Sequence, residues 1–305
     1  LFLIVLFISA FMLRLKAALT VPYIFDEELR KSIALGISFN IADLRIPAGN
    51  PEISLPLLCC YLMKAGYDIF GMNLFGARIL SVVLSTVGLY FIYALAKLGL
   101  GKEKAFYAIF LSTFCQFHIG WSRINEEDSL LLFFVPIVLY TFYKGITVKR
   151  QKLLILTGIL LSVGFYAKPS IFLLIPAFFL YSAMTKDYNW FVKELKNYFI
   201  IIGIPLIVLL PYLHYNFTHR LCDFKFYAEQ IHGIGIGLMP ITLFLGEAII
   251  YLAFWLNDGI IKNSTSFEYP FMNWALGLIC VIGSIYALKF RRSNFIRFIL
   301  MVLFA

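Results

Sequence analysis

The sequence predicts an all-α, polytopic integral membrane protein, a helix bundle of about nine spans with its functional site on external loops. Of its 305 residues 61% are hydrophobic and 14% are charged, whereas a soluble domain carries about 25% charged residues. The apolar residues also form continuous blocks, and about 20 such residues span a bilayer as a helix. A lipid-facing backbone must satisfy its own hydrogen bonds, and continuous blocks favour helices over the alternating pattern of a barrel.

The apolar blocks define the predicted spans and their connections. The chain begins at Leu1 inside one apolar run and ends inside another, so we interpret it as part of a longer protein. We interpret the first run as a span because no small-residue cleavage site follows it. The blocks cover about residues 1–20, 74–96, 104–120, 129–146, 153–167, 169–185, 197–213, 237–256, 271–290 and 294–305.

Basic residues predict the orientation, because Lys and Arg prefer the cytoplasmic side of a membrane. If four basic clusters all lie inside, the first seven blocks alternate across the membrane and the acidic segment after the first block lies outside. The net charge of +9 is then an excess at the cytoplasmic face and does not indicate nucleic-acid binding. The clusters are Lys97/Lys102/Lys104, Lys144/Lys149/Arg150/Lys152, Lys186/Lys193/Lys196 and Lys289/Arg291/Arg292/Arg297.

The same alternation divides the chain into three parts. Residues 1–213 form a transmembrane core with a first external loop at 21–73, residues 214–270 form a second external loop, and residues 271–305 form further spans. A crossing at 237–256 would put the last basic cluster outside, so we interpret this run as interfacial or re-entrant. The histidines and cysteines of the chain show no strong metal-binding spacing and no disulfide framework.

The first candidate for chemistry is the acidic run Asp26-Glu27-Glu28, directly after the first span. Three neighbouring carboxylates repel one another unless a positive group is close. Arg14 lies within or at the outer end of the preceding span, where a charge is costly without a partner or a task. The alternative interpretation is an acidic interfacial cap with a snorkelling arginine.

Two further candidates lie on the same predicted face. Residues 121–128 contain Arg123 and three acids that end in Asp128; the alternative is a solvated turn in which Asp128 caps the next helix. Lys168-Pro169 interrupts two apolar blocks at the level of a lipid phosphate. Its alternative is an interfacial lysine anchor, with Pro169 in the first turn of a new helix.

Taken in order, these residues resemble the GT-C superfamily of polyprenyl-phosphate-sugar glycosyltransferases. The order is an arginine in the first span, Asp-Glu after it, a proline-bearing external stretch, the sequence Asn-Leu-Phe-Gly-Ala-Arg at 73–78, Ser-Arg-x4-Asp at 122–128, and Lys-Pro at 168–169. The resemblance covers roughly residues 10–185. The branch it resembles is that of the protein O-mannosyltransferases and the lipid A aminoarabinose transferases.

The resemblance implies a role for each matched residue. Asp26 matches the catalytic base, with Glu27 beside it, and Asp128 matches a second external acid of the site. Arg123 and Lys168 match basic positions suited to the phosphate of the donor, and Arg14 is grouped with them.

A divalent metal cation is the one cofactor that the resemblance suggests, because Glu52 lies close to where relatives place a metal-contacting acid. Relatives often carry a Lys-Pro-Pro-Leu or His-Pro-Pro-Leu element in this loop. Here the stretch reads Ser54-Leu55-Pro56-Leu57, without the basic residue. This departure leaves both the metal and the type of acceptor open.

The resemblance implies an inverting glycosyltransferase in a membrane, expected to be the plasma membrane of a prokaryote, with its site on the extracytoplasmic face. An external carboxylate would deprotonate an acceptor hydroxyl that attacks the sugar of a polyprenyl-phosphate donor. Basic residues or a metal would stabilise the departing lipid phosphate. The acceptor is a protein, a lipid or a glycan, and membrane lipids are the other partners. The alternatives are a transporter or flippase of lipid-linked sugars, or a non-catalytic membrane scaffold.

Overall fold

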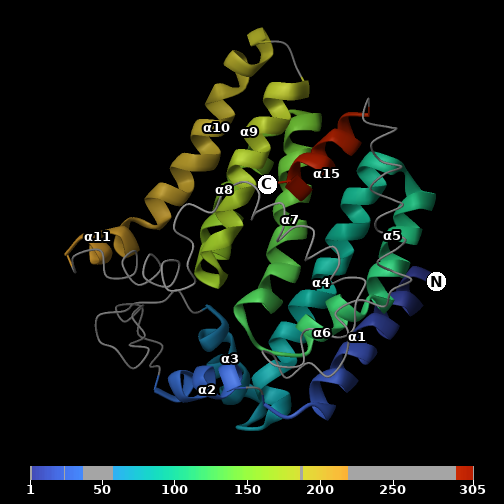
Figure 1. The fold of residues 1–305 in the computed structure, drawn as a ribbon, viewed down its shortest axis with the longest axis vertical. Coiled ribbons are helices and arrows are strands. Elements are labelled where there is room, and N and C mark those ends of the chain that lie inside the picture. The colour runs from blue at the N-terminus through green and yellow to red at the C-terminus, as the bar shows by residue number, and fades with distance from the viewer. Residues whose placement is uncertain (1, 24, 37–57, 186–187, 219–292, 305) are drawn as a thin grey trace, which may run out of the picture.

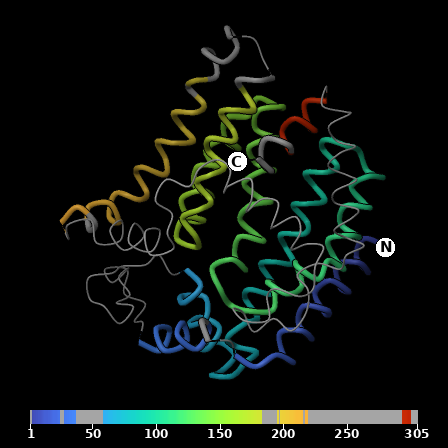
Figure 2. The backbone as a smooth tube through the Cα atoms, viewed as in Figure 1, coloured from blue at the N-terminus to red at the C-terminus, as the bar shows by residue number. Residues whose placement is uncertain are grey.

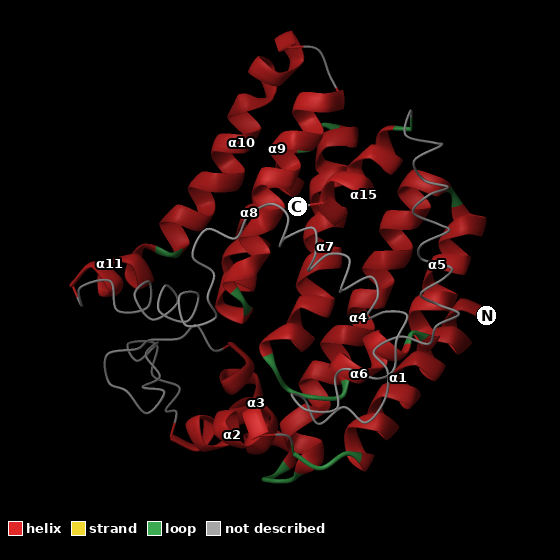
Figure 3. Ribbon diagram, viewed as in Figure 1, coloured by secondary structure: helices red, strands yellow, loops and turns green. Residues whose placement is uncertain are grey.

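The regular structure of the protein is helical throughout its described residues, in which no strand occurs (Figure 3). The computed structural model describes residues 2–23, 25–36, 58–185, 188–218 and 293–304. The helices are α1 (Phe2–Thr20), α2 (Phe25–Gly36), α3 (Leu58–Phe70), α4 (Leu74–Leu100), α5 (Lys102–Phe114), α6 (Gln116–Ser122), α7 (Glu127–Val148), α8 (Gln151–Ala167), the 3-10 helix η1 (Pro169–Leu173), α9 (Leu174–Thr185), α10 (Tyr188–Val208), α11 (Leu210–Thr218) and α15 (Asn294–Phe304).

The long helices follow one another in alternating directions through the bundle (Figures 1 and 2). The turn from α4 to α5 and the turn from α7 to α8 lie at the upper end of the view, as do the end of α9 and the start of α10, while α2, α3, α6 and the start of α7 lie at the lower end. We call the lower end the α2–α3 end. These two upper turns carry predicted cytoplasmic basic clusters, so the alternation predicted for the first seven blocks agrees with the directions of the described helices.

Three described helices are long and apolar enough to cross a membrane, and they are α1, α4 and α7. The shorter apolar helices cover Gln151–Ala167, Pro169–Ser182 and Asn197–Val208. Many large apolar side chains on α1 are exposed in the protein, for example Phe2 and Ile8. A bilayer solvates such side chains, which confirms the predicted class of a polytopic membrane protein.

Helix α4 lies at the centre of the bundle and packs against α1, α3, α5 and α7. Its crossing with α7 is close, since a Cβ atom built on Gly88 would lie 2.1 Å from the carbonyl oxygen of Leu132. Small residues of this kind permit close backbone approach between membrane helices. Farther along, the stacked rings of Phe142 and Phe178, with centroids 3.7 Å apart, pack with Phe298 between α7, α9 and α15.

Two predicted blocks differ from the helices that form. The block 104–120 is broken at Cys115, which is extended (φ −65°, ψ 116°) between α5 and α6. The block 197–213 belongs to a helix that begins earlier, at Tyr188, and is followed by α11. The run 237–256, which we interpreted as interfacial or re-entrant, lies outside the described residues, as does most of the predicted second external loop.

Candidate active site

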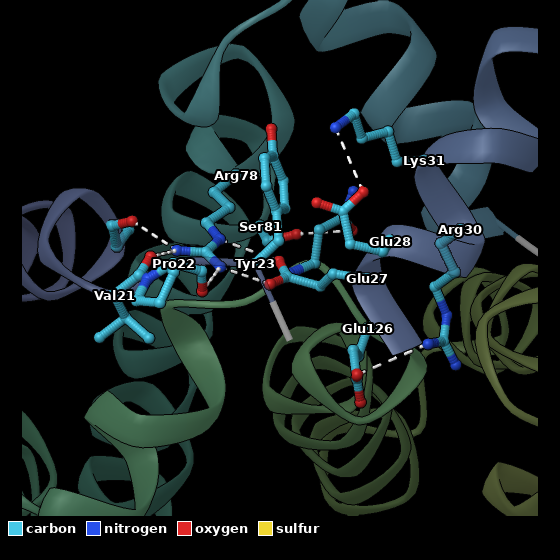
Figure 4. Close-up of polar contacts among 12 residues, drawn as sticks. Val21, Pro22, Tyr23, Glu27, Glu28, Arg30, Lys31, Arg78, Ser81 and Glu126 are labelled. Carbon is cyan, nitrogen blue, oxygen red and sulfur yellow. Dashed lines mark hydrogen bonds and ion pairs between the residues drawn. The ribbon is translucent and has the colours of Figure 1, made fainter. Parts of the chain in front are cut away.

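A fully buried ion pair between Glu27 of α2 and Arg78 of α4 lies at the α2–α3 end (Figure 4). The Nε of Arg78 donates to Glu27 Oε1 at 2.9 Å, and its Nη2 donates to Oε2 of the same carboxylate. Both side chains have no exposed surface. The arrangement is the two-pronged geometry by which a guanidinium binds a carboxylate most strongly.

Arg78 also satisfies the end of α1. Its Nη1 donates to the carbonyl oxygens of Ala18 at 2.7 Å and Val21 at 2.6 Å, and its Nη2 donates to that of Pro22 at 2.9 Å. The last carbonyl groups of a helix have no partner within the helix. Arg78 therefore binds the carbonyl groups at the C-terminal end of α1 and, through Glu27, holds α2 in place.

Asn125, in the turn between α6 and α7, connects this pair to α3 and to a second position on α4. Its backbone N–H donates to Glu27 Oε1 at 2.8 Å. Its side-chain Nδ2 donates to the carbonyl oxygen of Cys59 on α3 at 3.1 Å, and its Oδ1 accepts from Ser81 of α4 at 3.0 Å. Glu27 thus accepts hydrogen bonds from two elements and is enclosed by protein.

The start of α7 is bound to α2 through Arg30 (Figure 4). Its guanidinium lies 3.5 Å from Glu126 Oε1 and 3.3 Å from Glu127 Oε1. Burial disfavours the charge of Arg30, but neighbouring groups, these carboxylates among them, outweigh it and raise the pKa of Arg30 above its usual value. Arg30 therefore stays charged and holds α2 against the first turn of α7.

Asp128 and Lys168, two residues predicted for the site from separate segments, form an ion pair. Lys168 Nζ lies 2.6 Å from Asp128 Oδ1, and their side chains are 32% and 37% exposed. Asp128 lies in the first turn of α7, and Lys168 caps both the end of α8 and the start of η1. Pro169 takes the first position of η1, as predicted. The N-cap of α7 is Glu126 rather than Asp128, which leaves the Asp128 carboxylate available for the lysine.

Arg14 lies in a different part of the bundle, where α1 meets the break between α5 and α6. Its Nη1 donates to the carbonyl oxygens of Ala10 and Thr113, and its Nη2 donates to that of Ser112 at 3.2 Å and contacts His118 Nδ1 at 3.0 Å. Arg14 has no exposed surface. Its guanidinium satisfies carbonyl groups at the end of α5, which explains how the chain tolerates the break at Cys115.

The other predicted site residues are described only in part. Asp26 lies in the first turn of α2, directly before Glu27, and the position of its side chain is outside the description. Arg123 is half-buried in the turn after α6. Glu52 lies outside the described residues. Within the described part of the chain, no three His, Cys, Asp or Glu side chains are grouped so as to hold a metal ion, and the metal predicted near Glu52 stays a prediction.

Two residues of this network, Arg78 and Asn125, have no role predicted from the sequence. Arg78 ends the Asn-Leu-Phe-Gly-Ala-Arg motif, and a charged residue four positions inside a helix that is apolar enough to span a membrane is itself a signal of a partner or a task. Asn125 gave no such signal, because its three contacts go to residues at least 44 positions away.

These features define a polytopic helical membrane protein with a cluster of ion pairs at one end of its bundle. Residues 54–215 match the model of the dolichyl-phosphate-mannose-protein mannosyltransferase family, and because they make up more than half of the chain, the protein belongs to this family. The predicted GT-C resemblance is confirmed.

One solved structure supports the same fold. The protein is similar to ArnT from Cupriavidus metallidurans, crystallised bound to undecaprenyl phosphate, with a TM-score of 0.57 and 15% sequence identity over 98% of this chain. The chain spans 58% of the length of that protein. No curated protein sequence matches the chain significantly.

Proposed function

We propose that the protein is a glycosyltransferase that moves a sugar from a polyprenyl-phosphate donor to an acceptor hydroxyl at the α2–α3 end, on the extracytoplasmic side of the membrane. The observation that carries the proposal is the meeting of Lys168 with Asp128 beside the helix that bears Asp26, in a chain of this family. Arg30 of α2 contacts Glu127, the residue before Asp128, so the two parts of the site are adjacent.

In this proposal Asp26 is the general base. It takes the proton of the acceptor hydroxyl while the acceptor oxygen bonds to the anomeric carbon, and the bond from that carbon to the phosphate oxygen breaks. Displacement in one step inverts the anomeric centre. A positioned carboxylate base contributes roughly 10²–10⁴-fold to such a rate.

Lys168 and Arg123 are the proposed cationic partners of the donor phosphate. The phosphate gains negative charge as the sugar leaves, so a cation at that point stabilises the transition state more than the bound donor. A half-exposed lysine at the junction of α8 and η1 suits a ligand that approaches from the bilayer. ArnT, with the same fold, was crystallised with undecaprenyl phosphate, which supports a lipid phosphate as the ligand class.

Glu27 and Arg14 have supporting parts in the proposal. Glu27 is bonded to Arg78 and Asn125 and is shielded from solvent, which suits a residue that fixes α2 rather than one that accepts a proton from an acceptor. Arg14 is bonded to the carbonyl oxygens of α5 and has no exposed surface, which suits support of α6 and the turn after it rather than direct contact with a donor.

The test uses the full-length protein in proteoliposomes with a panel of polyprenyl-phosphate sugars, and it follows release of the free lipid phosphate. We expect release from one donor, and a loss of about 100-fold or more in Asp26→Asn with normal membrane insertion. Glu28→Gln is the matched control, because Glu28 is two positions away on the same helix and forms an exposed pair with Lys31. Release by Asp26→Asn at the wild-type rate would disprove the base, and no release from any donor would favour a transporter or a scaffold.

A further inference from the structure

Asp128 is bound to Lys168, the cation that the proposed function assigns to the donor phosphate. In the structure the Lys168 ammonium is 2.6 Å from a carboxylate oxygen of Asp128. A phosphate that binds the same ammonium must approach that carboxylate. Two anions at one lysine repel each other, so the carboxylate and the phosphate compete.

The exposure of the pair allows such an exchange. About a third of each side chain is open to solvent, and pairs of this kind add little net stability because water solvates both partners. A lysine ammonium is also a point charge on a flexible stem, which can turn from one oxygen to another. The Glu27–Arg78 pair at the same end is fully buried and bidentate, and it lacks these properties.

We propose that Asp128 is an internal competitor for the donor phosphate on Lys168, so that the pair opens when a lipid phosphate binds and closes when it leaves. The inference rests on the proposed function. Asp128 is then a positioning residue that acts through Lys168. Its return to Lys168 matters most after the transfer, because the free lipid phosphate carries more negative charge than the sugar-linked donor and would otherwise remain on the cation.

Removal of the Asp128 carboxylate should increase the affinity for the lipid phosphate, whereas a purely structural role for Asp128 does not predict an increase. Asp128→Asn should bind undecaprenyl phosphate roughly two- to fivefold more tightly than the wild type, the range expected when a partly exposed ion pair no longer opposes binding. Lys168→Met should bind it more weakly. In a Lys168→Met background, the Asp128→Asn change should have no further effect on affinity, because the two residues act through one contact.

The experiment is isothermal titration of the full-length protein in detergent with undecaprenyl phosphate, together with steady-state transfer. Asp128→Asn should lower the KM for the donor and also lower kcat by slowing product release. Asp128→Ser is a second variant that removes the negative charge. The control is Asp68→Asn, which breaks another lysine–aspartate pair, with Lys64 on α3, and should leave the affinity unchanged.

The outcomes separate the two proposals. The competition is supported if both Asp128 variants bind undecaprenyl phosphate more tightly than the wild type and this gain is absent in the Lys168→Met background. Equal or weaker binding by well-folded Asp128 variants, with binding by the wild type intact, overturns the competitor and leaves the proposed function in place. Failure of the wild-type protein to bind undecaprenyl phosphate overturns both.

Discussion

At the scale of single residues, the Glu27–Arg78 pair is a pair of charges in the interior of a membrane protein. Burial of two charges is costly, and the pair is tolerated because its remaining hydrogen-bonding groups have partners. Arg78 donates to three carbonyl oxygens at the exit of α1, and Glu27 accepts from the N–H of Asn125. The pair therefore joins α1, α2, α4 and the turn before α7, and places Asp26 next to them.

Loss of one partner of this pair should destabilise the protein strongly. Glu27→Gln or Arg78→Met leaves a charge buried without compensation, at a cost of about 3–5 kcal/mol, and thermal unfolding in detergent should show a clear fall in Tm. Arg78→Lys should not restore stability, because an ammonium cannot bind both carboxylate oxygens and the carbonyl groups of α1.

The control for that experiment is the exposed pair of Glu28 and Lys31, which lies one residue farther along α2. Glu28→Gln should change the free energy of unfolding by no more than about 1 kcal/mol. If Glu27→Gln and Glu28→Gln unfold at the same temperature, Glu27 does not have the structural part assigned to it.

At the scale of helices, the crossing of α4 and α7 connects the buried Glu27–Arg78 pair to the partly exposed Asp128–Lys168 pair. Helix α4 carries Arg78 near its start and α7 carries Asp128 near its start, so the spacing of these two helices sets the geometry of the site. Gly88 permits the close crossing, because any Cβ atom there would meet the backbone of α7 at Leu132.

Gly88→Ala should separate α4 and α7 and destabilise the protein by about 1–3 kcal/mol, the usual cost of an added group in a packed interior. A second measurement, the transfer rate, should fall as well, because Asp128 would move relative to α2. Gly203→Ala on α10 is the matched control, since a Cβ atom there would meet nothing within 4 Å and alanine favours a helix. Equal melting temperatures for the two variants would show that the crossing of α4 and α7 can accommodate a Cβ atom at position 88.

At the scale of the whole molecule, the helices place the candidate site and two basic clusters at opposite ends of the bundle (Figure 1). The α4–α5 and α7–α8 turns carry Lys97, Lys102 and Lys152, whereas the ion pairs of the site lie at the α2–α3 end. The preference of Lys and Arg for the cytoplasm then predicts an extracytoplasmic site.

This orientation is open to a labelling test in intact cells. Asp68→Cys lies on the exposed surface of α3 and should react with a membrane-impermeant thiol reagent in intact cells. Lys152→Cys, at the start of α8, should react only after the membrane is permeabilised. The unmodified protein gives the background, and its Cys59 and Cys60 are buried. The reverse pattern would place the site at the cytoplasmic face.

Much of the fold could be predicted because membrane spans are local features. The break at Lys168-Pro169 was predictable, since proline lacks the N–H that would continue α8 and fits the first turn of η1. The break at Cys115 was not, because Arg14, about 100 positions earlier in the chain, satisfies the carbonyl groups that make it tolerable. The predicted site residues were chosen from separate segments of the chain, and the pairing of Asp128 with Lys168 was not predicted.

The sequence by itself therefore determined the membrane class and the alternating path of the helices, because apolar length and charge are read directly along the chain. Only the tertiary structure decided which acid meets which cation. Glu27 pairs with Arg78, 51 positions away, and Asp128 with Lys168, 40 positions away. Such partners are selected by helix packing, which gives Glu27 a buried guanidinium and leaves Asp128 with a half-exposed lysine.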